Sequence, residues 1–480
     1  MSFYNADTKN IVSLYGIFKN SGINFLYAGR ITMLLIGNGR IVTREKAGNA
    51  GEACPFIENG AVAVDGSLIR ETGETAALRA KYPEAEYIDA RGRLVMPGFI
   101  NAHMHYYSTF ARGMSLGGKP ATTFGEILSG LWWRLDKQLT LDDVYYSCVG
   151  PMIDEVRGGV TTVIDHHASP YAVEGSLFKI AEAAELFGIR SNLCYETSDR
   201  DGEQIAEAGI RENAEFAKYC KEHNDDMLGA LFGMHAQMTI SDKTLEKCMA
   251  AAAGAGVGFH IHAAEGIEDV IDAVSKYGMR VIERLYKFGV LSKKSIAVHC
   301  IHTTEEEIDL LAKSGVAVVH NPQSNMGNAV GVSPVLDMLK KGVLVGMGTD
   351  GYSADVLDSY KTAAILHKHA KKLPSVAWAE PPAMLFENNP AIVERFINGK
   401  IGAIAKDHYA DIIIVDYKGP TPVNADTINS HILFGITGRH VDTTIINGKI
   451  VMKDRVLVNV DEDALLAKSR EQAEKLWKRI

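Results

Sequence analysis

The stretch LVMPGFINAHMH, residues 94–105, has the pattern of a short buried strand that runs directly into two histidines. Helix-length segments separate seven further runs of strand length: VTTVID (160–165), IRSNLCYE (189–196), LGALFGM (228–234), VGFHIHA (257–263), SIAVHC (295–300), GVAVVH (315–320) and VLVGMGTD (343–350). Eight strands that alternate with helices predict an α/β fold of the (β/α)8 TIM-barrel type. A doubly wound open sheet is disfavoured because no GxGxxG follows the early strands.

Two β-rich segments flank this central region. Between turn signals, residues 33–96 contain MLLIGNGRIV, GAVAVDGSLI and AEYIDARGRLV, and residues 401–460 contain DIIIVDYKG, HILFGITG and TTIINGKIVMKD. We expect both flanks to join in one small β-sandwich. The predicted division is an N-terminal extension without assigned role (1–32), the first sandwich part (33–96), the barrel (97–400), the second sandwich part (401–460) and an amphipathic C-terminal helix (461–480).

The composition is that of an ordinary globular protein. The 480 residues are 46% hydrophobic and 23% charged, with a formal net charge of −9, so the chain lacks the basic field that binds nucleic acid. No apolar run reaches membrane-spanning length, and residues 1–32 lack the pattern of a secretory signal. The six cysteines form no CxxC pair, which is typical of reduced thiols. We expect a cytoplasmic protein that binds neither nucleic acid nor membrane.

Histidine and acidic residues gather where the predicted strands end. The carboxyl ends of the strands of a (β/α)8 barrel face one mouth, so His103, His105, His262 and Asp350 are expected to converge there. Alternation along the first strand points His103 and His105 to the same side. An isolated HxH would be explained as well by two core or surface histidines. Three histidines and one carboxylate together are a chemically sensible ligand set for Zn²⁺ or Fe²⁺.

With these motifs in place, the chain resembles the amidohydrolase superfamily, in the branch of cytosine, guanine and methylthioadenosine deaminases and triazine hydrolases. The resemblance covers roughly residues 33 to 480. It is carried by PGFINAHMH (97–105), HAAE (262–265), AVHC (297–300), HNPQSN (320–325) and GTDG (348–351). HMHYYSTFARGM, LWWRLDKQLTLDDVYYS, DHHASP and LCYETSDRDG are similar to the SsnA subgroup of aminohydrolases, which is found near purine-catabolic enzymes.

The resemblance implies a role for each motif residue. Three side chains receive catalytic roles: Asp350 would accept a proton from the attacking water, Glu265 would shuttle a proton to a leaving nitrogen, and His299 would polarise the substrate. The implied ligands of one divalent metal, Zn²⁺ with Fe²⁺ as the alternative, are His103, His105, His262 and Asp350. Two-metal relatives carry a lysine at the end of strand four. Here that strand ends in GMHAQ (233–237), with no lysine before Lys243, which favours one metal.

Three residues are predicted to contact the substrate: His235 after strand four, Asn325 in HNPQSN, and Arg112 in the long loop after strand one. His235 is equally well explained as a core histidine bonded to the backbone. For Arg112 a structural salt bridge is the equal alternative.

Aromatic and histidine pairs near the mouth have two interpretations each. Trp132 and Trp133 in the loop after strand one could stack on a flat heterocycle, but packing of a helix face on the barrel is favoured. At most one of His166 and His167 is expected to be functional, because successive residues of a strand point in opposite directions.

Three functions compete for this chain. The first is hydrolysis of a non-peptide carbon–nitrogen bond, in a cyclic amidine or lactam of a purine-like heterocycle, either with loss of ammonia or with ring opening. The second is dehalogenation of a triazine-like ring. The third is a catalytically inactive barrel that serves as an assembly partner, which is disfavoured because every implied ligand, Glu265 and His299 are present. The resemblance also implies a homodimer.

Overall fold

The computed structural model describes residues 33–45, 56–115, 117 and 119–480. The predicted extension over residues 1–32 and one of the six cysteines, Cys54, lie outside the described residues. The strands are β1 (Leu34–Val42), β2 (Phe56–Asp65), β3 (Leu68–Glu74), β4 (Glu86–Asp89), β5 (Leu94–Pro97), β6 (Phe99–Met104), β7 (Val160–His167), β8 (Arg190–Tyr195), β9 (Leu228–Ala230), β10 (Phe232–Ala236), β11 (Phe259–Ala263), β12 (Ile296–His299), β13 (Ala317–His320), β14 (Leu344–Met347), β15 (Ile412–Val415), β16 (Val441–Ile446), β17 (Lys449–Lys453) and β18 (Val456–Leu457).

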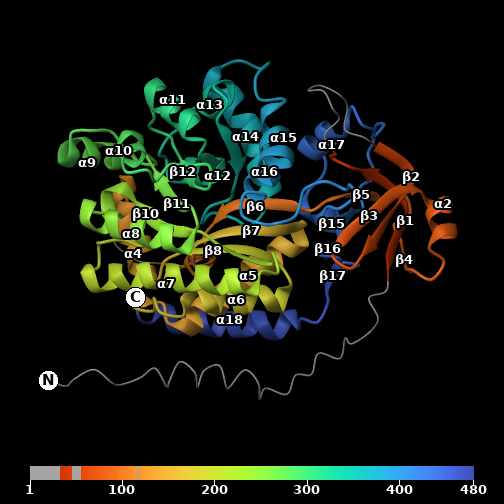
Figure 1. Ribbon diagram of the computed structural model, residues 1–480, viewed down its shortest axis with the longest axis horizontal. Helices are drawn as coiled ribbons and strands as arrows, with labels where there is room; N and C mark the ends of the chain where they lie inside the picture. Colours follow the sequence, from red (N-terminus) through yellow and green to blue (C-terminus); the bar gives the residue numbers. More distant parts are fainter. Residues whose placement is uncertain (1–32, 46–55, 116, 118) are drawn as a thin grey trace.

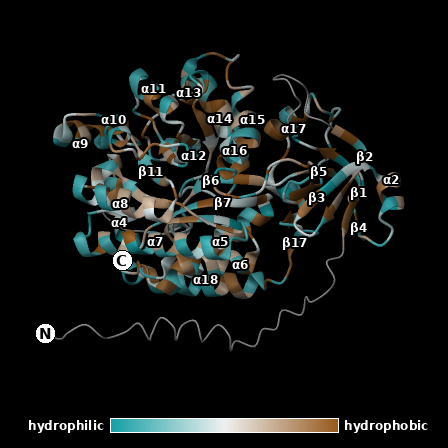
Figure 2. Cartoon of the chain, viewed as in Figure 1, coloured by the Kyte–Doolittle hydropathy of each residue, from teal (hydrophilic) through white to brown (hydrophobic). Residues whose placement is uncertain are grey.

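Helices surround the strands, and Figure 1 shows them on the outside of the central strands. The α-helices are α2 (Thr75–Lys81), α3 (Phe124–Ile127), α4 (Trp133–Leu135), α5 (Leu141–Gly158), α6 (Ser176–Phe187), α7 (Glu203–His223), α8 (Asp242–Ala255), α9 (Ile267–Tyr277), α10 (Val281–Lys287), α11 (Glu305–Ser314), α12 (Pro322–Gly327), α13 (Val335–Lys340), α14 (Val356–Lys371), α15 (Glu380–Ala383), α16 (Asn389–Val393), α17 (Ile428–Phe434) and α18 (Glu462–Trp477). Strands and inward helix faces are brown with apolar residues in Figure 2, and outward helix faces are largely teal.

Two parallel sheets form the centre of the molecule. One has the order β6-β7-β8-β9 and the other the order β10-β11-β12-β13-β14. Isolated parallel bridges connect the sheets at both ends, between Met104 and Asp350 and between Thr197 and Met234. Residues from both sheets, among them Ile100 and Val298, share one buried apolar cluster. The prediction of an α/β fold with parallel strands is confirmed.

The flanking segments meet in one further sheet. Among the described residues, nine strands from both ends of the chain pair in the order β18-β17-β16-β15-β5-β1-β2-β3, with β4 beside β1. The join is the antiparallel pair of β5 and β15, where Ile413 lies opposite Met96. Figure 1 shows this sheet at one end of the molecule, red and blue strands side by side. The predicted C-terminal helix is α18, which packs along α5.

Local structure differs from the sequence prediction at three places. HILFGITG (431–438) was expected to form a strand, but its first residues belong to helix α17, because Ile428 and Ile432 lie four residues apart and are both buried on one face. The predicted first strand divides at Gly98 into β5 and β6, which join different sheets. The predicted fourth strand divides likewise into β9 and β10. No helix in the described part of the chain is long and apolar enough to cross a membrane.

Candidate metal centre

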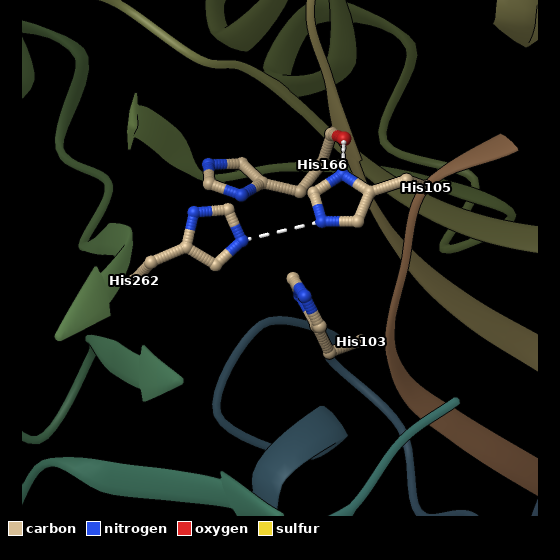
Figure 3. Close-up of side chains that lie close together, drawn as sticks. All are labelled: His103, His105, His166 and His262. Carbon is tan, nitrogen blue, oxygen red and sulfur yellow. Dashed lines mark hydrogen bonds between the residues drawn. The ribbon is translucent and has the colours of Figure 1, made fainter. Parts of the chain in front are cut away.

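Histidines from three strands meet at the carboxyl ends of the parallel sheets (Figure 3). His103 lies in β6, His105 directly after it, and His262 in β11, and all three are buried. Together with His166 of β7 they offer ligand atoms within 4.8 Å of one another. A second such group contains His103, His299 and Asp350.

The backbone fixes the tautomers of two of these rings. His105 donates its Nδ1 proton to the carbonyl of His166 at 2.5 Å, and His262 donates its Nδ1 proton to the carbonyl of His235 at 2.9 Å. Burial lowers the pKa of His105, but the carboxylates of Asp350 and Glu196 raise it well above its usual value when no metal is bound. A metal ligand must be neutral, and in the neutral ring the other nitrogen carries a lone pair. These two Nε2 atoms face each other at 3.2 Å. Two lone pairs at that distance repel unless a cation lies between them, and a backbone carbonyl on the far nitrogen is the usual support of a metal-binding histidine.

His103 is oriented by another histidine. Its Nδ1 lies 2.9 Å from Nε2 of His260, while its own Nε2 is buried and has no hydrogen-bond partner. Burial lowers the pKa of His103 to about 4, so the ring is neutral near pH 7, as a metal ligand must be. His260 therefore acts on the site through His103.

Asp350 completes the group from β14. Its backbone N–H donates to the carbonyl of His103 at 3.0 Å, and it adopts the left-handed conformation at a φ of 58°. A side chain at Gly348 would lie 2.6 Å from the same carbonyl oxygen, so glycine is required for this close approach. Burial alone would raise the pKa of Asp350, but the neighbouring rings of His103, His105 and His299 hold it well below its usual range.

The four predicted ligands fit a divalent metal. Oδ1 of Asp350 lies 3.2 Å from Nε2 of His105 and 3.7 Å from Nε2 of His103, and the two facing Nε2 atoms are 3.2 Å apart. Ligand atoms about 2.0 to 2.1 Å from a tetrahedral zinc are separated by about 3.3 Å. The donor set, its spacing and the unpartnered Nε2 of His103 all suit a metal of this kind.

The pKa values of two carboxylates at the centre are shifted in opposite directions. Burial, reinforced by the charge of Asp350, raises the pKa of Glu265 well above its usual range. The raised pKa favours the protonated form of Glu265 and the lowered pKa favours the ionised form of Asp350, which is the pairing that an acid and a base at one site require. Nε2 of His299 lies 3.4 Å from Glu265 and 3.5 Å from Asp350, and its Nδ1 is 2.8 Å from Oδ1 of Asn325.

The pocket beside these groups is partly open to solvent. His105, His262, Glu265 and Asp350 line its floor, and aromatic side chains line its walls. Trp132 and Trp133 are among the lining residues, and both also pack on the buried apolar cluster that contains Phe124 and Leu128. Leu128–Trp132 forms one turn of π-helix, and Trp133 follows it directly at the start of α4.

The three residues predicted to contact the substrate lie in three different surroundings. His235 lines the pocket, and burial lowers its pKa to about 4, so its ring is neutral. Asn325 is fully buried behind His299 and contacts that ring, while Ser324 and Asn328 of the same segment line the pocket instead. Arg112 lies outside the pocket with 63% of its side chain exposed, and it pairs with Asp154 at 3.5 Å. Neither Asn325 nor Arg112 is among the residues that line the pocket, so their contact with substrate stays a prediction that the lining does not support.

His166 and His167 have different surroundings. His166 stacks on His260 with ring centroids 4.4 Å apart, and neither of its ring nitrogens has a hydrogen-bond partner. His167 is held by Ser169 at 2.9 Å and touches Tyr107. His166 is thus the member of the pair that reaches the metal centre.

Comparison with known proteins decides the family. Residues 94–451 match the amidohydrolase family, and residues 60–85 match the imidazolonepropionase-like composite domain of bacteria. The chain belongs to the amidohydrolase family. Its relatives are deaminases: the 5′-deoxyadenosine deaminase of Methanosarcina mazei is 30% identical over 93% of this chain and 99% of its own length. The 5-methylthioadenosine/S-adenosylhomocysteine deaminase of Desulforudis audaxviator is 30% identical over 87% of this chain and 95% of its own.

Solved structures agree on the fold of this amidohydrolase. An adenosine deaminase from Xanthomonas campestris, solved with bound zinc, superposes with a TM-score of 0.81 at 24% identity, over 92% of this chain and 98% of that one. The prediction of a hydrolase that acts on non-peptide carbon–nitrogen bonds is confirmed by the family and its deaminase relatives. A divalent-metal site is supported by the histidine and aspartate clusters.

Sequence reasoning missed two polar residues of this amidohydrolase pocket. Glu196 follows β8 and Asp136 follows α4, and both side chains are buried and line the pocket. The run IRSNLCYE ends on Glu196, so the position of an acid at a strand end was a usable signal. Asp136 offered none, because the loop that carries it has no periodic pattern leading to the pocket.

Proposed function

We propose that this chain is a zinc-dependent deaminase that removes an exocyclic amino group from a purine-like ring and releases ammonia. The observation that carries the proposal is the pair of facing Nε2 atoms of His105 and His262, each with its other nitrogen committed to a backbone carbonyl. The deaminase relatives support loss of ammonia over ring opening. Zinc is proposed ahead of iron because a structure of the same fold holds it.

In the proposed reaction, His103, His105, His262 and Asp350 hold the metal. When bound, a divalent metal supplies a nucleophile near neutral pH by lowering the pKa of water. Asp350, ionised at the centre, accepts a proton from the attacking water. Glu265, protonated at the pocket floor, donates a proton to a nitrogen of the substrate.

His299 is proposed to stabilise the charge that develops on the attacked amidine. Its Nδ1 donates to Asn325, which fixes the ring plane and leaves Nε2 between Glu265 and Asp350. From that place it can exchange a hydrogen bond with a heteroatom of the ring. The aromatic walls, Trp132 and Trp133 among them, suit a flat heterocycle.

We further propose that the parallel strands close into a (β/α)8 barrel at residues 97–400. The two bridges between the sheets support closure, because they connect β6 to the end of β14 and the end of β8 to β10. We propose a β-sandwich of residues 33–96 and 401–460, supported by their shared sheet and shared apolar cluster. Residues 461–480 would then form a separate helix packed on the barrel.

Alternative functions use the same donor set. A triazine-type hydrolase would release halide from a chlorinated ring, and an inactive barrel would bind metal without turnover. Membership of the SsnA subgroup, a place in purine catabolism and a homodimer stay predictions. Sedimentation of the purified chain tests the homodimer.

The test is an assay of the zinc-loaded chain against adenine, guanine, adenosine, 5′-deoxyadenosine and chlorinated triazines. We expect ammonia release in step with the absorbance change of an intact purine ring. Removal of zinc by a chelator should abolish the activity, and added zinc should restore it. Halide release from the triazines alone would favour the second function. No ammonia from any purine, with zinc bound at one equivalent per chain, would overturn the proposal.

A further inference from the structure

Glu196 is a buried carboxylate to which the proposed reaction gives no role. Its backbone N–H donates to the carbonyl of His167 at 2.7 Å, and its side chain is 4% exposed. The side chain lines the same pocket as His235 and Trp133, whose rings are 6.2 Å apart. Burial of a carboxylate costs free energy unless hydrogen bonds or an opposite charge compensate it, so the partners of Glu196 are informative.

Hydrogen bonds inside the protein leave this carboxylate unsatisfied. Oε1 lies 3.2 Å from Nδ1 of His105, but that proton is directed to the carbonyl of His166 at 2.5 Å, and Oε1 makes no hydrogen bond. Oε2 faces Nε2 of His235 at 3.9 Å, which is beyond hydrogen-bonding distance. Glu196 therefore presents lone pairs to the pocket.

His235 presents a lone pair as well. The hydroxyl of Thr239 donates to the carbonyl of Ala236 at 3.0 Å, so its oxygen accepts from Nδ1 of His235 at 2.8 Å. In the neutral ring Nε2 is then an acceptor. Two acceptors, Oε2 of Glu196 and Nε2 of His235, face each other with no proton between them. A hydrogen-bond donor from the pocket would satisfy both.

The charge of the pocket lining also favours a ligand that donates hydrogen bonds. Its described lining includes four carboxylates and neither lysine nor arginine; the acidic residues are Asp136, Glu196, Glu265 and Asp350. Asp136 is paired with Arg200, which lies outside the lining. Asp350 and Glu265 belong to the reacting centre. Glu196 is the lining carboxylate left for a ligand.

We propose that Glu196 is a specificity-determining residue: with His235 it binds a hydrogen-bond donor of the substrate, an amino, ring N–H or hydroxyl group, and it excludes anionic substituents. This contact would select the substrate of the proposed deaminase, so the inference rests on the proposed function for the reaction that follows binding. A second cation is the competing occupant, because Glu196, His235 and His262 offer ligand atoms close together. Nε2 of His262 already faces His105, so a second ion would have to take that donor from the first.

The test compares the zinc-loaded wild type with Glu196→Gln, which keeps the shape and removes the charge. Glu212→Gln is the matched control, because Glu212 is also a buried glutamate but lies on α7 outside the pocket. The probes are adenine, guanine, adenosine and adenosine 5′-monophosphate, measured by calorimetric binding and by steady-state turnover. Zinc per chain is measured for each variant.

We expect Glu196→Gln to weaken binding of the neutral purines, and to raise their KM, by about tenfold or more with a smaller change in kcat. The preference for adenosine over its 5′-monophosphate should fall by a similar factor. Zinc content should stay at one equivalent, and Glu212→Gln should behave as wild type in binding. Unchanged KM and unchanged charge preference would overturn the inference. Loss of zinc without a change in binding would also overturn it, because Glu196 would then act only through His105.

Calorimetry separates this inference from the proposed function. If the wild type binds purines in a Glu196-dependent way but releases no ammonia, the deaminase proposal fails and the contact stands. If ammonia is released and Glu196→Gln binds like wild type, the contact fails alone. Two zinc equivalents in the wild type, reduced to one in Glu196→Gln, would assign Glu196 to a metal instead. Failure of the wild type to bind any of the four probes would overturn the contact, and ammonia release from 5′-deoxyadenosine would then decide the deaminase proposal on its own.

Discussion

Single residues at the metal centre are held in conformations that cost free energy. His299 and Asp350, with φ values of 69° and 58°, and Ala264 at 49° adopt the left-handed region directly at strand ends. Such conformations persist where surrounding contacts enforce them. The hydrogen bond from the backbone N–H of Asp350 to the carbonyl of His103 is one such contact.

Asp350→Asn tests the role of the ionised carboxylate. The amide cannot accept the proton of the attacking water and supplies no negative charge, so we expect kcat to fall by about 1,000-fold while the fold is retained. Turnover, zinc content and circular dichroism of the variant check this. Rates within a few-fold of wild type would refute the role of Asp350.

Glu212 makes stability depend on pH at a position outside the pocket. It accepts hydrogen bonds from the backbone N–H groups of Gly175 and Leu177 at 2.8 and 2.9 Å, where α6 begins. Burial raises its pKa from 4.5 to about 7 despite these bonds. The folded state therefore binds the proton more tightly than the unfolded state, and its advantage is present below pH 4.5 and lost as pH rises through 7.

Glu212→Gln should remove this dependence. Relative to the variant, the wild type is expected to lose up to about 3 kcal/mol of unfolding free energy between pH 4.5 and pH 8. The variant also loses one acceptor, which lowers its stability by a constant amount at every pH. Urea unfolding of both proteins at pH 5 and pH 8 measures the difference. A difference that does not change with pH would contradict the raised pKa.

At the scale of elements, the end of the last helix, α18, contacts the segment that precedes α5 and that contributes residues to the pocket lining. The guanidinium of Arg479, just beyond α18, donates to the carbonyl of Gln138 and pairs with Asp143, and Trp477 donates to the carbonyl of Phe110 at 2.7 Å. Gln138 ends the 3-10 turn Asp136–Gln138, whose first residue lines the pocket. The C-terminal residues therefore contact the support of the pocket rather than the pocket itself.

Arg479→Ala should loosen this support. Loss of the charged hydrogen bonds is expected to cost about 1 to 3 kcal/mol of unfolding free energy and to raise KM more than it lowers kcat. Thermal unfolding and steady-state kinetics check both effects. Lys475→Ala is the control, because that side chain on α18 pairs only with the exposed Glu471 among the described contacts. Equal behaviour of the two variants would show that the contacts of Arg479 do not support the pocket.

At the scale of the whole molecule, a buried ion pair joins the central sheets to the sheet formed by both flanks. Arg190 opens β8 and Asp411 precedes β15, and their side chains are 2% and 1% exposed, 3.2 Å apart. Asp411 also accepts the backbone N–H of Asn447 at 2.7 Å, and Arg190 donates to the carbonyl of Asp226. Removal of one partner leaves the other charge buried and unpaired.

Asp411→Asn is therefore expected to lower the unfolding free energy by about 3 to 5 kcal/mol. Asp416→Asn breaks the more exposed pair with Arg93 and should cost about 1 kcal/mol or less. Denaturant unfolding of both variants gives the comparison. If both cost the same, the buried pair does not connect the two parts of the molecule in the way described.

The sequence by itself determined the elements and the chemistry of the centre. Strand-length apolar runs that end in histidine or aspartate predict parallel strands and a shared edge, because side-chain alternation and strand polarity are local properties. His103, His105, His262 and Asp350 could be named for this reason, and the structure brings them together. The four-residue spacing of Ile428 and Ile432, which forms the buried face of α17, is a local property too. The run HILFGITG begins at His431, after Ile428, so the run alone does not contain this spacing.

Only the tertiary structure decided what surrounds the centre. The tautomers of His105 and His262 depend on carbonyls of His166 and His235, which lie 61 and 27 residues away in sequence. The exposure of Arg112, the burial of Asn325 and the place of Trp132 and Trp133 beside the pocket depend on how distant segments pack, which no periodicity encodes. The pKa values followed the same rule: Asp350 and Glu265 are both carboxylic acids, and the opposite shifts of their pKa values come from burial and neighbours that exist only once the chain has folded.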